Sequence, residues 1–167
     1  MAYQFVWNSL AERSDVLNQH PRSLRIKGRQ RQTDFMTVFS QHSIEIRVSY
    51  HETDGQGRVH HANYLNYFEQ GRVELLRAAG ASYKDFEAAG RMLVVTEMNV
   101  RYLLPAEFDD CLRLTTRVLS SRGARIRHNY ELYRGDMILV SADSTIACID
   151  RQGRPTRLPP DWQQGRV

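Results

Sequence analysis

A single acidic side chain lies in a glycine-containing stretch just before a helix-like segment of the 167-residue chain. The stretch ETDGQGRVHHANYLNYFEQGRVELLR spans residues 52–77 and contains Asp54, Gly57 and His61. A carboxylate can attack a carbonyl carbon itself or take a proton from an attacking water, and a nearby histidine can assist. An aspartate among glycines is also the usual composition of a surface turn. The residue types therefore allow chemistry on a carbonyl group without requiring it.

The helix that follows adds hydrogen-bond donors. The pattern predicts a helix from about Ala62 to Ala79, which Gly80 ends. The first N–H groups of a helix have no partner within it, and the positive end of the helix dipole lies there. The N–H of Tyr64 is the candidate donor to a negatively charged oxygen. Every helix start has such donors, so this feature is not specific on its own.

The same helix pattern predicts one broad apolar face toward a core. The residues on this face are Tyr64, Leu65, Phe68, Gly71, Leu75 and Ala79. Gly71 costs ~1 kcal/mol of helix propensity relative to alanine, which predicts a close approach of the sheet at that point. Arg72 falls in the same arc. A buried arginine needs an acidic partner, and Glu69 and Asp54 are the candidates.

The other apolar patterns predict strands. Residues 43–50 alternate and place Ile44, Ile46, Val48 and Tyr50 on one face. Four later strand-like runs are RMLVVTEMNVRYLL, CLRLTTRVLSS, ARIRHNYELYR and MILVSADSTIACID, and a short helix capped by Ser82 precedes them. In the third run Ile126, His128, Tyr130 and Leu132 share a face. One strand, one long helix and then four strands indicate an α+β fold, in which an antiparallel sheet covers the helix.

Composition and charge suit one soluble domain. The chain is 41% hydrophobic and 25% charged, and no apolar run approaches the roughly 20 residues of a membrane span. We expect residues 1–41 to be a flexible basic arm, or the product of a start codon assigned too early, since Met36 could also begin the chain. Residues 161–167 are expected to be a tail. Cys111 and Cys148 fall in predicted strands and indicate buried thiols in the reducing cytoplasm rather than a disulfide.

Residues 50–77, YHETDGQGRVHHANYLNYFEQGRVELLR, form the most specific pattern of the sequence. This pattern resembles the 4-hydroxybenzoyl-CoA thioesterase family of the hotdog-fold superfamily. The matching positions are Tyr50, Thr53, Asp54, Gly57, Val59, residues 61–64, residues 67–69, Arg72 and residues 74–77. The later segment DRQGRPTRLP, residues 150–159, is also similar to that family. The resemblance covers about residues 43–160, and we take 42–160 as the predicted hotdog thioesterase domain.

The resemblance implies a five-stranded antiparallel sheet wrapped around one long helix, in a homodimer or homotetramer with active sites between subunits. It implies hydrolysis of an acyl- or aroyl-CoA to the free acid and coenzyme A, without a cofactor other than the coenzyme A of the substrate. Asp54 would be the catalytic carboxylate, as nucleophile or general base. His61 would orient the water or contact Asp54 or the thioester, unless it only caps the helix, and Tyr64 would supply the oxyanion donor.

Substrate contacts are expected at five further positions: Gly57, Asn63, Glu69, Arg122 and Arg125. Gly57 would let the thioester approach the backbone, and Asn63 would line the acyl end of the site. Glu69 would support the site or pair with Arg72. Arg122 and Arg125, of the same or of a neighbouring subunit, would bind the phosphates of coenzyme A. Exposed arginines are also common at hairpins.

Two other function classes remain open at this point. A hotdog-fold hydratase or dehydratase uses the pattern D-x-N-P-x-H, whereas here His60 and His61 follow Asp54 by six and seven residues without Asn or Pro between them. A non-catalytic acyl-CoA-binding protein could retain the same motif. We expect no metal site at His51, Asp54, His60 and His61, because their spacing matches no closed ligand motif. Nucleic-acid binding by the basic arm is not expected either.

Overall fold

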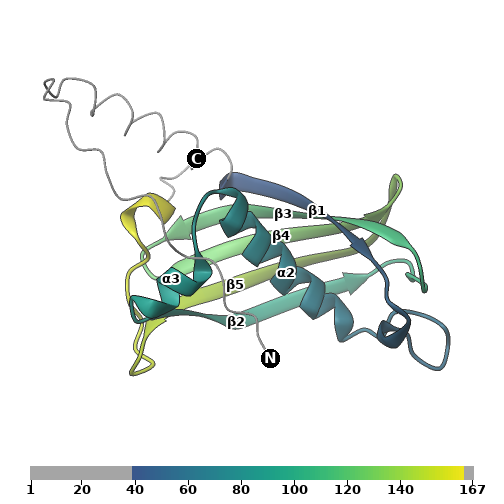
Figure 1. Ribbon diagram of the computed structural model, residues 1–167, viewed down its shortest axis with the longest axis horizontal. Helices are drawn as coiled ribbons and strands as arrows, with labels where there is room; N and C mark the ends of the chain where they lie inside the picture. The colour runs from purple at the N-terminus through teal and green to yellow at the C-terminus, as the bar shows by residue number, and fades with distance from the viewer. Residues whose placement is uncertain (1–38, 164–167) are drawn as a thin grey trace, which may run out of the picture.

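The computed structural model describes residues 39–163 and consists of a helical layer on one face of a curved sheet (Figure 1). The strands are β1 (Gln41–Arg47), β2 (Arg91–Tyr102), β3 (Cys111–Arg122), β4 (Arg125–Arg134) and β5 (Met137–Asp150). The helices are α2 (Asn63–Ala78) and α3 (Tyr83–Ala88), with short 3-10 helices η1 (Tyr50–Glu52) and η2 (Pro160–Trp162). This order confirms the α+β prediction. None of the described helices has the length and apolarity needed to span a membrane.

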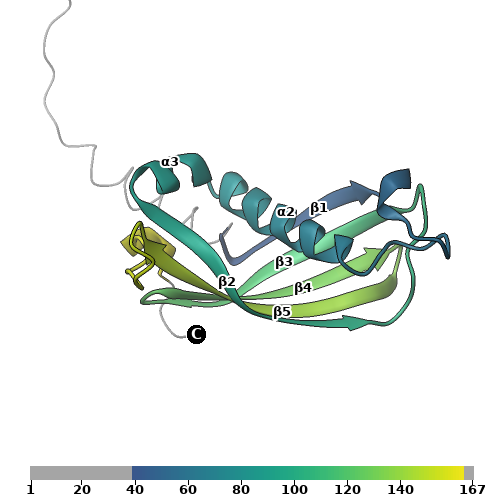
Figure 2. The ribbon, with the colours of Figure 1, turned by 90° about the horizontal axis from the view of Figure 1, so that it is seen from below.

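The five strands form one antiparallel sheet in the order β1-β3-β4-β5-β2. β3, β4 and β5 are joined by hairpins whose turns contain Gly123 and Gly135, both with positive φ. β1 and β2 therefore lie at opposite edges of the sheet. Among the described residues, no strand pairs with the outer edge of β2. Figure 2 shows the sheet curving beneath α2 and α3.

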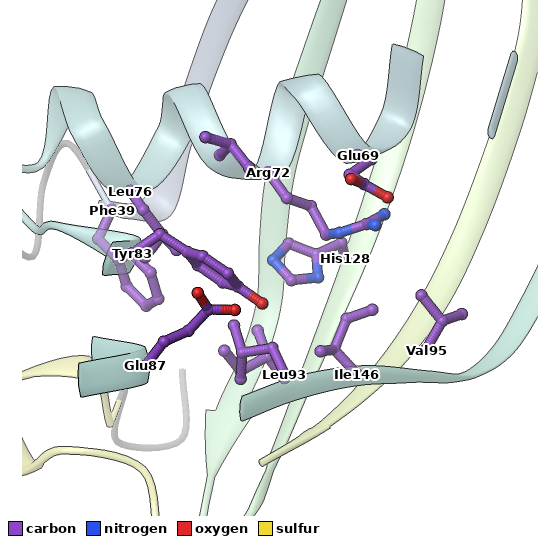
Figure 3. A pocket seen from close by; sticks show the side chains of 12 residues that line it. Phe39, Glu69, Arg72, Leu76, Tyr83, Glu87, Leu93, Val95, His128 and Ile146 are labelled. Atoms are coloured by element: carbon purple, nitrogen blue, oxygen red, sulfur yellow. The ribbon is translucent and has the colours of Figure 1, made fainter. Parts of the chain in front are cut away.

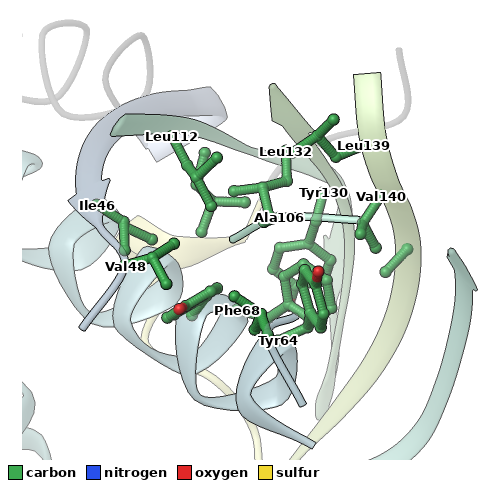
Figure 4. Packing of buried hydrophobic residues seen from close by; sticks show 14 residues of the cluster. Ile46, Val48, Tyr64, Phe68, Ala106, Leu112, Tyr130, Leu132, Leu139 and Val140 are labelled. Atoms are coloured by element: carbon green, nitrogen blue, oxygen red, sulfur yellow. The ribbon is translucent and has the colours of Figure 1, made fainter. Parts of the chain in front are cut away.

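The core lies between α2 and the concave face of the sheet (Figure 4). Alternate residues of β3 and β4, among them Leu114 and Leu132, are fully buried against the helix. The helix contributes Phe68 and Leu75, which are also fully buried. Burial of one such side chain stabilises the fold by roughly 1.5–3 kcal/mol. The alternating pattern of the strands thus holds the helix, and with it the loop before the helix, in one orientation.

Gly71 confirms the predicted close approach of helix and sheet. A Cβ atom on this residue would collide with Thr116 Oγ1 and would lie 2.8 Å from Leu114 Cδ2. Both neighbours belong to β3 and are fully buried. Glycine is therefore used here to fit the helix against the sheet, at a cost in helix propensity.

Two apolar positions differ from the prediction. Tyr50 is 77% exposed because β1 ends at Arg47 and the chain turns into η1, where Ser49 and Glu52 form a capping box. Leu65 is 43% exposed, and Tyr67 is buried instead. The buried face of α2 is thus rotated slightly from the predicted one.

The packed part of the chain extends beyond residues 42–160 at both ends. Phe39 and Trp162 are buried, with ring centroids 6.0 Å apart. Trp162 also stacks on Phe86 of α3, at 4.7 Å between ring centroids. As predicted, the Ser82 hydroxyl caps α3 by accepting a hydrogen bond from the N–H of Asp85. Most of the predicted arm, residues 1–38, and the end of the tail, residues 164–167, lie outside the described residues.

Candidate active site

The three predicted catalytic residues line one cavity at the end of the sheet where β2 ends. Asp54, His61 and Tyr64 border a space of about 310 Å³. The rest of the lining consists of Arg58, Val59, Tyr102, Leu103, Leu104 and Pro105. The cavity therefore combines one carboxylate, one imidazole and a helix start with apolar and aromatic walls.

Asp54 lies in a tight turn, in which one of its two carboxylate oxygens accepts hydrogen bonds from the backbone. The N–H of Gly57, a residue with φ of +74°, donates to the carbonyl oxygen of Asp54 at 2.9 Å. Oδ1 of Asp54 accepts a hydrogen bond from the N–H of Gln56 at 2.8 Å. Oδ2 has no hydrogen-bond partner among the described residues. The geometry thus confirms the turn interpretation, because Oδ1 fixes the side chain, and it leaves Oδ2 available for the predicted chemistry.

Residues that the prediction did not select hold this loop on the helix. Oε2 of Glu52 accepts hydrogen bonds from the N–H of Ser49 at 2.7 Å and from the hydroxyl of Tyr67 at 2.9 Å. Burial, together with the adjacent Glu52 carboxylate, raises the pKa of Tyr67. The side-chain amide of Asn63 donates to the carbonyl oxygen of Glu52 at 2.7 Å. Asn63 is therefore tied to the loop and is not among the residues that line the cavity.

The start of α2 offers an unpaired backbone donor on Tyr64, a residue that lines the same cavity as Asp54. The N–H of Asn63 donates to His60 and that of Leu65 donates to Ala62. No hydrogen bond from the N–H of Tyr64 is found within residues 39–163. The ring of Tyr64 is buried edge-on against that of Tyr102, and burial raises the pKa of both phenols. The predicted oxyanion donor is thus unpaired and close to the aromatic wall of the cavity.

His61 lies at the rim rather than against the carboxylate. Its side chain is exposed, its ring lies 4.2 Å from that of His60, and its carbonyl oxygen accepts a hydrogen bond from Tyr102. No hydrogen bond joins His61 to Asp54 among the described residues. At the neighbouring position, Nδ1 of His60 accepts a hydrogen bond from the N–H of Ala62 at 3.3 Å, although no side chain caps α2 at its N-cap. His60 is exposed, as predicted.

Glu69 borders a second cavity, of about 320 Å³, between the two helices and the sheet (Figure 3). Arg72 and His128 line it as well. The predicted pairing of Arg72 with Glu69 or Asp54 is wrong, because no ion pair of Arg72 is formed within the described residues. Its Nη1 instead donates to the hydroxyl of Tyr130 on β4 at 3.0 Å. The phenol reaches the helix from the sheet and takes the place expected for an acid.

Arg122 and Arg125 border a third, more open space of about 500 Å³. Thr96, Glu97, Ser120, Arg127 and Thr145 complete its lining. The two arginines flank the β3–β4 hairpin, where Arg122 pairs with Arg125, at the end of the sheet opposite the Asp54 loop. Within one subunit the structure therefore does not bring these arginines to the carboxylate.

Metal ligands do not cluster in the part of the chain that the structure describes. No group of three or more His, Cys, Asp or Glu side chains is close enough there to hold an ion. The described site thus consists of a carboxylate, backbone donors and aromatic walls.

Comparison with known proteins places this site in context. Residues 48–166 match the family model described as thioesterase-like superfamily. The chain is 35% identical over 109 residues to an acyl-CoA thioesterase, YbgC, of Haemophilus influenzae, covering 65% of this chain and 80% of that protein. It is 32% identical over 123 residues to a putative acyl-CoA thioesterase, YneP, of Bacillus subtilis, covering 71% and 89%.

Solved structures share the fold. A probable thioesterase from Bartonella henselae is 36% identical with a TM-score of 0.69, over 72% of this chain and all of that chain. A DHNA-CoA thioesterase from Staphylococcus aureus is 29% identical with a TM-score of 0.71, over 73% and 85%. The expected hotdog fold is thereby confirmed. A narrower relation to 4-hydroxybenzoyl-CoA thioesterases is not established by these similarities.

Proposed function

Because the chain belongs to the thioesterase-like superfamily, we propose that it hydrolyses acyl-CoA thioesters to a free acid and coenzyme A. The single observation that carries this proposal is the shared cavity of Asp54 and Tyr64. It combines a carboxylate oxygen without a hydrogen-bond partner and an unpaired N–H at a helix start. The relatives named as acyl-CoA thioesterases support the same substrate class.

The proposed reaction uses one water molecule and no cofactor besides the coenzyme A of the substrate. Oδ2 of Asp54 takes a proton from water while the water oxygen attacks the thioester carbonyl carbon. The N–H of Tyr64 donates to the resulting oxyanion, assisted by the positive end of the α2 dipole. Collapse of this intermediate breaks the C–S bond, and the leaving sulfur takes the proton from Asp54 and departs as the thiol, which restores the carboxylate. If Oδ2 attacks directly, an acyl–aspartyl anhydride forms first and water cleaves it, with the same products.

His61 and Gly57 have supporting roles in this proposal. His61 lines the cavity with its side chain exposed, so it contacts the water or the thioester rather than the carboxylate. Gly57 gives the Asp54 turn its positive φ, which lets the thioester approach the loop backbone. Both roles depend on the substrate and not on contacts within the chain.

The proposed enzyme is a homodimer in which the β2 strands of two subunits pair antiparallel. The outer edge of β2 is unpaired among the described residues, and Val95 on this strand is 51% exposed. An unpaired edge of twelve residues is a ready template for another strand. If the two β2 strands pair antiparallel with their midpoints side by side, Tyr102 of one subunit lies opposite Arg91 of the partner subunit. The Asp54 cavity of one subunit then adjoins Leu93 and Val95 of the other.

This pairing explains why the predicted substrate residues are spread over one subunit. Leu93 and Val95 line the cavity that contains Glu69 and Arg72, so the acyl group of a thioester at Asp54 would enter that cavity of the partner subunit. Antiparallel pairing of the two β2 strands also brings the hairpin end of the partner subunit, with its Arg122 and Arg125, toward the Asp54 loop. These arginines would bind the phosphates of coenzyme A.

A cytoplasmic location completes the proposal. Both cysteines are free, Cys148 buried and Cys111 exposed, contrary to the prediction that both are buried. An exposed free thiol fits a reducing compartment.

The test is thiol release from saturated acyl-CoA substrates, from acetyl to long-chain, and from benzoyl-CoA. A hydratase cannot act on a saturated acyl group, so released thiol separates the two classes. We expect Asp54→Asn to lower kcat at least about 100-fold. The amide oxygen can still accept the hydrogen bond from Gln56, so the turn is preserved. Asp136→Asn, in the exposed β4–β5 turn, is the matched control and should not change kcat. Unchanged hydrolysis by Asp54→Asn would show that the carboxylate is not the catalytic group.

A further inference from the structure

The cavity between α2, α3 and the sheet has mostly apolar walls and one polar end. Its apolar lining includes Leu76, Leu93, Ile126 and Ile146. Figure 3 shows Arg72 and His128 side by side at the polar end, under α2. An engineered cavity of about 150 Å³ holds benzene, so the 320 Å³ here have room for a substituted ring or a medium-length chain.

His128 is the unusual group in this cavity. It is 4% exposed, and its Nδ1 has no hydrogen-bond partner. Buried polar atoms are nearly always paired, so Nδ1 of His128, which borders the cavity, is available to a polar group that enters it. Burial, with the adjacent Arg72 charge, lowers the pKa of His128 to about 3, so the imidazole is neutral near pH 7. In the tautomer that carries its proton on Nε2, Nδ1 is a hydrogen-bond acceptor.

Arg72 supplies donors beside that acceptor. Its Nη1 donates to the hydroxyl of Tyr130, which in turn lies 2.8 Å from the Ser144 hydroxyl. This chain of contacts fixes the guanidinium, whose remaining N–H groups have no partner among the described residues. A guanidinium has five N–H donors, so several are left for a ligand.

The charges of the lining decide what kind of group suits this end. Glu69 borders the cavity beside Arg72, and Glu87 borders it from α3 next to Tyr83, so the lining carries two carboxylates and one guanidinium besides the neutral imidazole. A ligand carboxylate would meet this negative excess and could not donate to His128. A neutral hydroxyl can accept a hydrogen bond from Arg72 and donate one to Nδ1 of His128.

We propose that Arg72 and His128 make this cavity select acyl groups that carry a neutral hydroxyl at the end remote from the thioester. The inference rests on the proposed function, in which the cavity receives the acyl group of a thioester bound at the Asp54 loop of the partner subunit. His128 is then a specificity-determining residue and takes no part in the bond-breaking step.

Equilibrium binding tests this selection separately from hydrolysis. Dissociation constants of the full chain are measured by calorimetry for two thioethers that cannot be hydrolysed, S-hexyl-CoA and S-(6-hydroxyhexyl)-CoA. We expect the hydroxylated ligand to bind roughly tenfold more tightly than the plain one. A thioether ending in a carboxylate should bind more weakly than either. The ratio of kcat/KM for 6-hydroxyhexanoyl-CoA over hexanoyl-CoA should show the same preference.

Variants assign the preference to the residues named. His128→Leu should reduce the ratio of the two dissociation constants to about one while S-hexyl-CoA still binds, and His128→Gln should restore part of it. Ile126→Val, which alters the same wall without a polar atom, is the control and should keep the ratio. If His128→Leu does not fold, Arg72→Met must reduce the ratio instead.

Equal binding of the two thioethers by the unaltered chain, or an unchanged ratio in His128→Leu, overturns the inference. Hydroxyl-selective binding without any thiol release would instead uphold the selection and contradict the proposed hydrolysis. The two proposals can thus fail separately.

Discussion

Gly71 packs α2 directly against β3, and its replacement by alanine has two opposing effects on stability. Alanine gains about 1 kcal/mol of helix propensity over glycine. The added Cβ would collide with Thr116 Oγ1 and lie 2.8 Å from Leu114 Cδ2, and neither fully buried neighbour can move into solvent. Overpacking of this kind costs about 2–3 kcal/mol. Gly71→Ala should therefore lower the free energy of unfolding by about 1–2 kcal/mol.

Urea denaturation followed by circular dichroism measures this change. Gln70→Ala, at an exposed position of the same helix, is the control and should change stability by only a few tenths of a kcal/mol. Adding Thr116→Ala to Gly71→Ala removes the nearest clash, so the double variant should lose less stability than the sum of the two single changes. A Gly71→Ala protein as stable as the unaltered chain would refute the close-packing argument.

Three further predictions concern stability. His128 titrates near 6.5 when unfolded and near 3 when folded. The unfolded state therefore binds more protons between these values, and the free energy of unfolding should fall as pH drops below 6.5, by up to about 1.4 kcal/mol per pH unit. Urea midpoints of His128→Leu should lack this part of the pH dependence. Tyr67→Phe removes the hydrogen bond to the Glu52 carboxylate and should cost about 1.5–3 kcal/mol, seen as a lower urea midpoint. Trp162→Ala should cost about 3–5 kcal/mol in thermal unfolding, because the ring stacks on Phe86; an unchanged midpoint would place residues 161–167 outside the domain.

The sequence was sufficient to predict the strands and the long helix, because their hydrophobic patterns are local. Period-two alternation predicted the strands, and the apolar face with Gly80 predicted a helix within one residue of α2 at each end. Tyr50 was misplaced because its alternation continues past Arg47, where the capping box of η1 turns the chain. The sequence contains the signature of this capping box, Ser49 followed three residues later by Glu52. The alternating pattern favoured a longer strand over this signature.

The site was predictable only in part, because half of it depends on distant segments. Asp54 and Tyr64 are close in sequence, so motif and helix start sufficed to bring them together. Arg72 and Tyr130 are 58 residues apart in the sequence. Sequence patterns therefore favoured an acid close to Arg72 as its partner. Local alternation placed His128 on the apolar face of its strand. Its position beside Arg72 in a cavity depends on how two helices cover the sheet, which no local pattern contains.

The contact between Phe39 and Trp162 brings the two ends of the described chain to one corner of the molecule, beside α3 and across the sheet from the Asp54 loop. In a chain shortened to residues 39–163, a fusion partner or affinity tag attached at either end would therefore leave from the side away from the carboxylate. The same proximity favours circular permutation. In the shortened chain a short linker could join Phe39 to Gln163, and new ends could open at the exposed turn of Gly135 without breaking a strand.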